Sequence, residues 1–512
     1  MHPTTSSPDG ALATRREWLG LGVITIACMI YSMDLSVLFL AVPSIVKDLK
    51  PTPTQLLWIN DIYGFMVAGF LVTMGSLGDR IGRRKVLLIG AAAFGATSCL
   101  AAFSTSPNML ILARALQGIA GATIAPSTLS LVFSMFPNEA EKNRAMGVWG
   151  TGFAVGGLVG PVIGGVLLQY FGWGSVFLIN VPIMATLLIV APYLLPEYKS
   201  ENGGKLDLVS VALSLGTILP IIFGLKHLAA YGVAIAPFAA ILLGLIFGYL
   251  FIRRQKMLAD PMIDLALFKV PAFNTALLVN LAGIFFVFAV FLYQNQYLQL
   301  VLDLSPLEAG LWSIIPSLIF TFMSLYSHKF ISRFGASQAV IGGLIINAVA
   351  FGAMAVAAIS ANLYGILGAA MLIGLGFVPV ILTTMNMIVS SAPIERAGAA
   401  SAISETSAEL GGALGIAIMG SLATLIYRFG MADIDMTGVP PEATAAARAT
   451  LAGAVESAIP YAGDHIPWLD VAKDSFSASF AMICIAGTLS FISLALLVHK
   501  VFDKRGPNET MA

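Results

Sequence analysis

Residues 75–85 read Gly75-Ser76-Leu77-Gly78-Asp79-Arg80-Ile81-Gly82-Arg83-Arg84-Lys85. They join two apolar runs, 57–77 and 86–104, each of a length that crosses a bilayer as a helix. Glycines allow a tight turn, and Asp79 can pair with a facing arginine or with a helix N-terminus. An ordinary basic loop would explain the positive charges but not the Gly-Asp-Arg-x-Gly-Arg-Arg order. The stretch predicts a conformational motif formed by Gly75, Asp79, Arg80, Gly82 and Arg83, whose ionic contact breaks and re-forms during movement.

The composition of the 512-residue chain indicates an integral membrane protein. Hydrophobic residues make up 58% of it and charged residues 11%, the net charge is zero, and the mean hydropathy is +0.89. Disordered, collagenous, coiled-coil and nucleic-acid-binding proteins are excluded, because none is so apolar without net charge. Three scattered cysteines, Cys28, Cys99 and Cys484, exclude a disulfide framework and a CxxC metal or redox site. We therefore expect no metal site and no nucleic-acid partner.

Apolar runs near the length needed to cross a bilayer, about 20 residues, predict fourteen spans. Their lack of alternation favours helices over barrel strands, so we predict an all-α polytopic fold. Residues 1–17 lack the cleavage pattern of a signal peptide, and we expect the first span to be retained. The runs lie near 18–42, 57–77, 86–104, 108–133, 146–169, 176–195, 208–228, 233–252, 273–299, 307–326, 339–359, 363–390, 399–426 and 476–500.

The distribution of Lys and Arg predicts the orientation. Twenty of the 27 basic residues fall in the segments that are cytoplasmic if the N-terminus is inside, and six fall on the opposite side. Arg114 is the remaining one and lies within a span. We therefore expect a multi-pass protein of the cytoplasmic membrane with both termini in the cytoplasm.

An internal repeat relates the two ends of the chain. A shift of 253 residues superimposes Pro126 on Pro379, Gly90 on Gly343, and Arg80-Ile81-Gly82 on Arg333-Phe334-Gly335. Two similar halves facing a central cavity are typical of transporters, in which one half rocks against the other. The predicted parts are a cytoplasmic segment 1–17, an N-terminal six-helix half 18–195, an inserted two-helix hairpin with its flanking loops 196–272, a C-terminal six-helix half 273–500 with a long outer loop 428–474, and a tail 501–512.

Several segments resemble the major facilitator superfamily. The resemblance comprises the 75–85 signature, the arginine motif at 112–121, the antiporter motif at 152–165, and the segments 33–43, 57–63 and 173–182. It covers nearly the whole chain and is strongest to fourteen-span drug:H+ antiporters that export quaternary ammonium compounds. The resemblance implies the major facilitator fold with 14 transmembrane helices, two six-helix halves plus an inserted helical hairpin. We expect a monomer.

Glycines in span 5 recur every four residues and form one ridge of the helix, beside a proline that allows a bend. The ridge consists of Gly152, Gly156, Gly160 and Gly164, with Pro161. One interpretation is static helix packing. The other, implied by the resemblance, is that this helix seals the halves on one face and so permits exchange without leak.

Charged side chains inside spans are functional candidates, because a bilayer makes them costly. Asp34 and Arg114 lie about 13 and 10 Å below the predicted outer face, and the resemblance places their spans side by side. Such a pair can bind and release a proton, or it can be a permanent salt bridge. Asp61, near the start of span 2, is either a carboxylate at the entrance for cations or an interfacial polar residue.

Span 13 carries Glu405 and Glu409, four residues apart and therefore on one helix face. Two like charges near the bilayer midplane do not both ionise cheaply, so at least one is expected to hold a proton until a cation arrives. A structural role with another partner is the alternative. The resemblance implies a cation site and favours Glu409, which we also assign to proton coupling together with Asp34 and Arg114.

Aromatic side chains such as Trp149, Phe153 and Tyr293 are candidates for stacking on a cationic drug, although each can simply pack. Span 10 has no acidic residue between Leu311 and Tyr326, whereas some relatives that export bivalent cations have one there. This difference puts efficient transport of dications in doubt.

These observations predict a proton-coupled exporter of lipophilic organic cations that has no cofactor and no catalytic residue. Export of an endogenous metabolite, lipid or siderophore is one alternative, and a non-transporting receptor on the same fold is another. An enzyme is disfavoured, because the chain has no GxxxxGK[ST] loop, no HExxH and no Ser/His/Asp set within a span.

Overall fold

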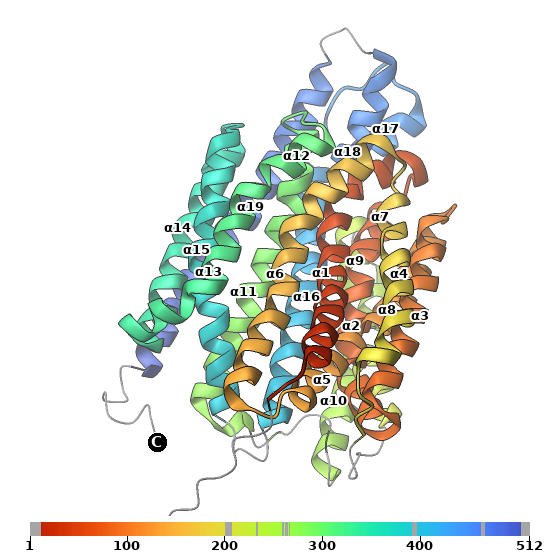
Figure 1. Ribbon diagram of the computed structural model, residues 1–512. Helices are drawn as coiled ribbons and strands as arrows, with labels where there is room; N and C mark the ends of the chain where they lie inside the picture. The colour runs from red at the N-terminus through yellow and green to blue at the C-terminus, as the bar shows by residue number, and fades with distance from the viewer. Residues whose placement is uncertain are drawn as a thin grey trace, which may run out of the picture.

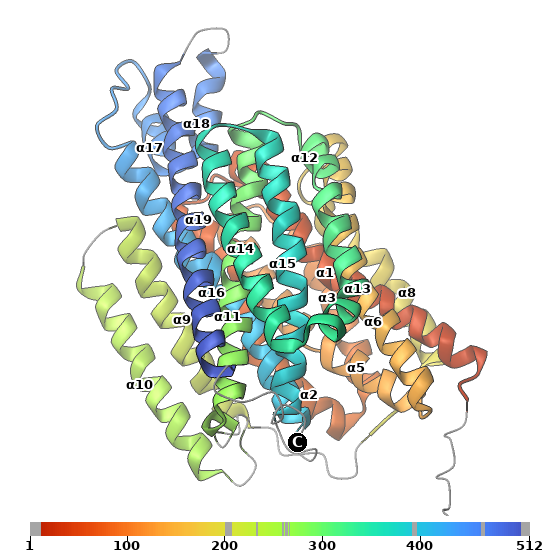
Figure 2. The same cartoon turned by 90° about the vertical axis from the view of Figure 1, so that its left-hand side faces the viewer.

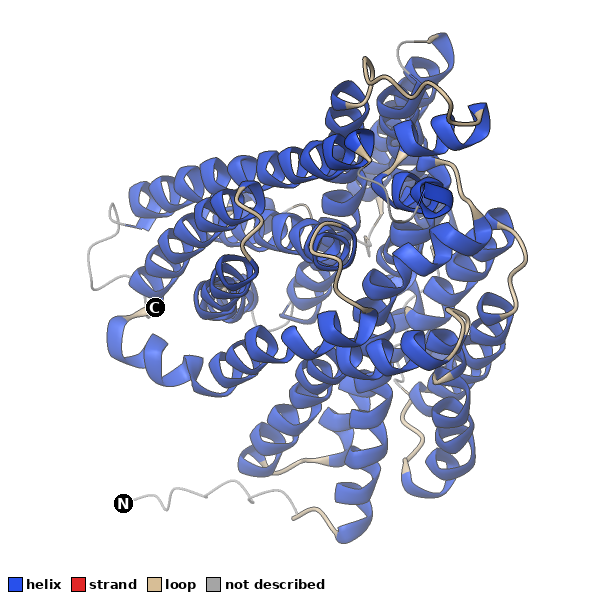
Figure 3. Ribbon diagram, turned by 90° about the horizontal axis from the view of Figure 1, so that it is seen from above, coloured by secondary structure: helices blue, strands red, loops and turns tan. Residues whose placement is uncertain are grey.

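The computed structural model describes residues 12–199, 207–231, 234–258, 261, 265, 267–391, 397–461 and 466–502. Within these residues the chain is helical and contains no strand, which confirms the all-α prediction (Figure 3). Thirteen described segments are long and apolar enough to cross a membrane. The remaining predicted span corresponds to α2 (Pro53–Ile81), whose 29 residues suffice in length but include the polar Asn60 and Asp61.

The N-terminal helices follow the predicted spans, with two breaks. They are α1 (Arg15–Leu49), α2, α3 (Arg83–Ala102), α4 (Pro107–Gly121), α5 (Ile124–Met135), α6 (Glu139–Tyr170), α7 (Ser175–Leu178) and α8 (Asn180–Leu194). The predicted spans 108–133 and 176–195 are therefore each divided in two. A proline follows each break: Pro126 offers no N–H to the carbonyl of Ala122, and Pro182 offers none to that of Leu178.

The second part of the chain contains the hairpin and the C-terminal helices. These are α9 (Leu208–Tyr231), α10 (Ile235–Met257), η1 (Leu267–Lys269), α11 (Pro271–Leu300), α12 (Pro306–Trp312), α13 (Ile314–Phe334), α14 (Ala336–Ile359), α15 (Leu363–Ser390), α16 (Ala397–Gly430), α17 (Pro441–Ala449), α18 (Leu451–Ala458), η3 (Ile459–Tyr461) and α19 (Pro467–Phe502). Figure 1 shows the long helices standing side by side along one direction.

The hairpin lies at the side of the molecule (Figure 2). Helix α9 packs against α2 and α16, whereas α10 packs mainly against α9 and leaves most of its surface exposed. The Arg254 guanidinium pairs with the carboxylate of Asp207 at 2.7 Å and so joins the two ends of the hairpin. Burial raises the pKa of Asp207, but hydrogen bonds from Arg254 and Ser210 outweigh it and hold that pKa at about 2.

Both halves use the same turn and the same close helix contact. Gly82, between α2 and α3, has φ +116°, and Gly335, between α13 and α14, has φ +84°; these angles are strained for residues with a side chain. Gly156 brings α6 against the backbone of α1 at Met29, and Gly411 brings α16 against the backbone of α11. The repeat in the sequence therefore corresponds to repeated backbone geometry.

The two halves touch each other near the predicted outer end. Helix α1 packs against α11, and α6 packs against α12 and α13. A Cβ placed on Gly165 of α6 would lie 2.8 Å from the carbonyl oxygen of Pro306 on α12. The side-chain amide of Gln299, on α11, donates a 3.1 Å hydrogen bond to the carbonyl of Leu40 on α1.

The predicted outer loop 428–474 is largely helical in its described residues. Helix α16 runs to Gly430, α17 and α18 follow, and α19 begins at Pro467 rather than near residue 476. The Tyr427 hydroxyl donates a 2.8 Å hydrogen bond to the carbonyl of Ala447, which holds α17 on the end of α16. Helix α18 packs against α1, α11 and α19.

Candidate functional site

A buried ion pair lies in the core of the N-terminal half. Asp34 on α1 is 3% exposed and Arg114 on α4 is fully buried. The Arg114 guanidinium donates a 2.5 Å hydrogen bond to Oδ2 of Asp34, so the predicted proximity of the two spans is found. The positions 253 residues later are Val287 and Leu367, both buried and apolar. This buried ion pair thus has no equivalent in the C-terminal half.

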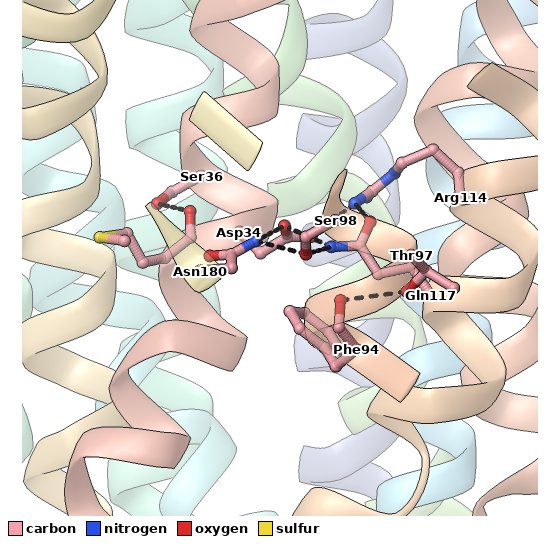
Figure 4. A network of polar contacts seen from close by, with 9 residues as sticks. Asp34, Ser36, Phe94, Thr97, Ser98, Arg114, Gln117 and Asn180 are labelled. Carbon is pink, nitrogen blue, oxygen red and sulfur yellow. Dashed lines mark hydrogen bonds and ion pairs between the residues drawn. The ribbon is translucent and has the colours of Figure 1, made fainter. Parts of the chain in front are cut away.

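Three further polar residues complete this network (Figure 4). The amides of Gln117 and Asn180 donate hydrogen bonds of 3.0 and 2.9 Å to Oδ1 of Asp34, and both also donate to the hydroxyl of Ser98. With Arg114, the Asp34 carboxylate therefore accepts three hydrogen bonds. A buried carboxylate is tolerated in its ionised form when it is paired and hydrogen-bonded in this way.

The Arg114 side chain also lies against two aromatic rings. Its guanidinium carbon is 4.5 Å from the ring centre of Tyr63 on α2 and 5.7 Å from that of Phe177 on α7. Its Nε and second terminal nitrogen have no hydrogen-bond partner within the described part of the chain. The ring faces provide the attraction that these donors do not obtain from oxygen atoms.

The two carboxylates of α16 lie in the C-terminal half and are half-buried. Neither Glu405 nor Glu409 forms an ion pair within the described residues. The hydroxyl of Tyr31, on α1 of the other half, donates a 2.6 Å hydrogen bond to Oε1 of Glu409. Within the described part of the chain, therefore, neither carboxylate has a basic partner, and Glu409 has a neutral one.

A cavity of about 220 Å³ lies between the halves, among α1, α6, α11, α13 and α15. None of the described residues that line it has a charged side chain. Five phenylalanines, two amides and four serines account for most of the lining: Phe39, Phe153, Phe288, Phe291, Phe320, Gln294, Asn295, Ser32, Ser36, Ser313 and Ser317. Of these residues, the sequence indicated only Phe153 as a candidate for stacking on a cationic drug.

The other residues predicted to bind the cation are not among the described residues that line this cavity. Trp149 contacts the cavity wall from behind: its ring packs edge-to-face with that of Phe153, and the ring centres are 4.9 Å apart. Its indole N–H donates a hydrogen bond to the hydroxyl of Thr128. Tyr293 stacks on Phe476, with ring centres 5.4 Å apart. It lines a second, smaller pocket, and residues 449–452 are also part of that lining. Asp61 is buried in α2. Glu405 and Glu409 lie on α16, which contributes no residue to the described part of the cavity lining.

Residues 24–416 match the family model described as Major Facilitator Superfamily. The chain belongs to this superfamily. The match covers most of the chain and agrees with the helical fold and the central cavity.

The chain is similar to the Multidrug efflux pump LfrA of Mycolicibacterium smegmatis. The two are 38% identical over 502 residues, which cover 97% of this chain and 99% of the relative. It is also similar to the Methyl viologen resistance protein SmvA of Salmonella typhimurium, with 33% identity over 94% of this chain and 97% of the relative.

A solved transporter structure has the same fold. It is a bacterial homolog to the human lysosomal transporter Spinster, in an inward-facing and unoccupied conformation. The TM-score is 0.68 at 16% sequence identity, with 96% of this chain and 98% of the other covered.

The loop signature of this major facilitator protein is tied to its own half. The buried Arg83 donates a 3.3 Å hydrogen bond to the carbonyl of Pro126 on α5, and a Cβ on Gly75 would lie 3.7 Å from the same proline. Glu197, just after α8, accepts a hydrogen bond from the backbone N–H of Arg84 and pairs with its guanidinium. Arg80 is exposed, and the side chain of Asp79 lies outside the described ones.

The glycine ridge of α6 packs on α1 within the N-terminal half. A Cβ on Gly152, Gly156, Gly160 or Gly164 would meet the backbone or side chains of α1, which corresponds to the packing interpretation. The contact between halves is made instead by the neighbouring Gly165 against Pro306, and by Pro161, whose carbonyl abuts Gly310 of α12.

Proposed function

We propose that this chain exports lipophilic organic cations, such as quaternary ammonium compounds, dyes and cationic antiseptics, in exchange for protons by alternating access. The observation that carries the proposal is the separation of two features. An uncharged, aromatic cavity lies between the halves, and two carboxylates without a basic partner in the described residues lie on α16. The names of the relatives, a multidrug efflux pump and a methyl viologen resistance protein, support drug export.

The cavity lining favours a flat apolar monocation as the substrate. Phenylalanine faces attract a cation within about 6 Å of the ring centre, and apolar surface removes the rest of the molecule from water. A dication would bring a second charge into a lining whose described residues include no carboxylate. Lining amides and serines provide polar contacts that fix orientation.

Protons supply the driving force in this proposal, and no cofactor is needed. We assign proton coupling to Asp34, Arg114 and Glu409, and binding of the substrate's charge to Glu405 and Glu409. Each elementary charge that crosses 100 mV provides about 2.3 kcal/mol. Exchange of two or more protons for one monocation therefore supports a steep outward accumulation of the drug.

The contacts between the halves support a direction of access. The halves pack closely at Gly165 and Pro306 and at Gln299 and Leu40, near the end that the basic residues predict to be outer. We infer that the outer path is closed in this structure and that a substrate enters the cavity from the cytoplasm. The chain acts as a monomer in this scheme, because one chain contains both halves.

Drug transport in everted membrane vesicles tests the proposal. Ethidium uptake into vesicles is measured with and without a proton ionophore, for the parent, Asp34→Asn and Glu409→Gln, with the exposed Asp435→Asn as matched control. We expect ionophore-sensitive uptake by the parent and the control, and loss in the other two. Absence of ionophore-sensitive uptake by the parent overturns the exchange proposal. Parent rates in Asp34→Asn and Glu409→Gln overturn the residue assignment alone.

The uncharged lining of the cavity also favours a second candidate, export of a neutral aromatic metabolite, lipid or siderophore. A neutral aromatic compound then competes with ethidium and is itself accumulated in vesicles. Competition without accumulation of any neutral compound argues against this candidate.

A further inference from the structure

Tyr31 lies where the two halves, the cavity wall and the buried ion pair come together. Its side chain is 4% exposed, and its hydroxyl donates a 2.6 Å hydrogen bond to Glu409 across the interface between the halves. Its ring meets that of Phe153 edge-on at 6.0 Å. Phe153 also lines the cavity, so Tyr31 links the cavity wall to Glu409.

Tyr31 also connects Glu409 to the charges of the N-terminal half. Its ring centre is 6.1 Å from that of Tyr63 on α2, and the Arg114 guanidinium lies over the Tyr63 ring at 4.5 Å. Arg114 in turn pairs with Asp34. A continuous chain of contacts therefore joins the carboxylate of one half to the carboxylate of the other.

The strength of the bond between Tyr31 and Glu409 depends on what Glu409 holds. A hydroxyl bound to an ionised carboxylate forms a charge-assisted hydrogen bond, about twice as strong as a neutral one. A proton on Glu409 neutralises the carboxylate that the hydroxyl binds. A bound cation competes with the hydroxyl for the same negative charge. The tie between α1 and α16 is therefore strongest when Glu409 is ionised and empty.

We propose that Tyr31 is a positioning residue that couples the state of Glu409 to the contact between the halves. The bond holds α1 against α16 while Glu409 is empty and releases α1 when Glu409 binds a proton or a drug cation. A drug in the cavity acts on the same side chain through Phe153. This inference rests on the proposed function and adds to it the residue that converts binding into movement.

A double-mutant cycle tests the coupling in everted vesicles. Tyr31→Phe keeps the ring and removes the hydroxyl, and Glu409→Asp keeps the charge but shortens the side chain. We expect Tyr31→Phe to lower the maximal rate of ethidium transport about tenfold, the effect of losing a hydrogen bond to a charged group, with little change in KM. Glu409→Asp should cause no further loss in the Tyr31→Phe background, because both changes remove the same bond.

Two controls separate coupling from packing. Tyr297→Phe removes a buried hydroxyl that donates a 2.7 Å bond to Ala358 within the C-terminal half, and it should transport at the parent rate. Glu405→Asp should cause the same fractional loss with and without Tyr31→Phe. A parent rate in Tyr31→Phe, or losses that multiply in the Tyr31→Phe, Glu409→Asp double variant, overturns the inference.

A measurement that needs no substrate distinguishes failure of this inference from failure of the proposed function. Leu57 on α2 and Gly420 on α16 are in contact across the halves, so Leu57→Cys with Gly420→Cys reports on their proximity through disulfide yield. We expect Tyr31→Phe to lower that yield and Tyr297→Phe to leave it unchanged. An unchanged yield in Tyr31→Phe overturns the inference, whether or not the parent exports ethidium.

Discussion

The side-chain amide of Asn180, the first residue of α8, donates a 2.9 Å hydrogen bond to Oδ1 of Asp34 on α1. This contact joins the sixth predicted span to the first and helps to stabilise a carboxylate that has almost no access to water. Since unpaired buried charges are costly, the amide contributes to the stability of the half as well as to the geometry of the ion pair.

Replacing Asn180 should destabilise the protein, and a replacement that introduces a negative charge should destabilise it more. Asn180→Ala removes one of three donors to Asp34, which costs about 1–3 kcal/mol. Asn180→Asp adds a second carboxylate and should cost more, because like charges repel in a buried site. Thermal unfolding in detergent, followed by tryptophan fluorescence, measures both. The control is Asn108→Ala, which removes an exposed bond to Gln55; equal melting temperatures for Asn180→Ala and this control would contradict the prediction.

Gly165 should be needed for the seal between the halves. Gly165→Ala places a Cβ against the carbonyl of Pro306, and overpacking of this kind costs roughly 1–3 kcal/mol. We expect faster passive proton entry into vesicles without any drug. Gly150→Ala is the matched control in the same helix, because a Cβ there meets nothing within 4 Å. Proton entry at the parent rate in Gly165→Ala would show that the contact does not seal the path.

The hairpin should lose stability in acid. The pKa of Asp207 lies at about 2 in the folded protein, against an ordinary value of 3.8, because hydrogen bonds from Arg254 and Ser210 outweigh burial. A lowered pKa stabilises the fold above the ordinary value, and this stabilisation is lost as the pH falls from 3.8 towards 2. Asp207→Asn should therefore melt at a lower temperature than the parent at pH 7, and the difference should shrink below pH 3.8. A difference that is the same at pH 7 and in acid would refute this assignment.

A carboxylate added to the cavity should broaden the range of substrates. Ser317 lines the cavity on α13, within the predicted span that has no acidic residue. Ser317→Asp should raise the efflux of the dication methyl viologen relative to that of the monocation tetraphenylphosphonium, because a second charge then meets a partner. Ser317→Asn has nearly the same size without the charge and should leave the ratio unchanged. Equal ratios in the two variants would indicate that the added charge has no role.

Much of the architecture follows from sequence periodicity, because membrane spans and their flanking charges are dictated by the bilayer. The helices lie where the apolar runs predicted them, and Gly82 and Gly335 form the turns that the repeat indicated. Prolines account for the divided spans, since Pro126 and Pro182 each remove one helical hydrogen bond. Each of these features depends on residues close together in the chain, so it can be predicted from the sequence.

The candidate site was less accessible from the sequence. Tyr31 and Glu409 are separated by 378 residues, and no spacing rule brings them together. Trp149 is an aromatic residue of a suitable type, but Phe153 stands between it and the cavity. Gln117 and Asn180 lie within segments that resemble the family, which was the available signal for their contact with Asp34. Which helix faces the cavity depends on packing between the halves, and hydropathy does not encode it.

The repeat keeps turns and glycines but not the buried ion pair, since Val287 and Leu367 occupy the positions equivalent to Asp34 and Arg114. The two halves therefore differ in the charged residues that their spans carry. The first half keeps a neutralised pair that stabilises its core, and the second carries carboxylates that have no basic partner in the described residues. Under selection by a new toxic cation, adaptive substitutions should therefore accumulate in the second half and around the cavity, while the Asp34 network stays fixed.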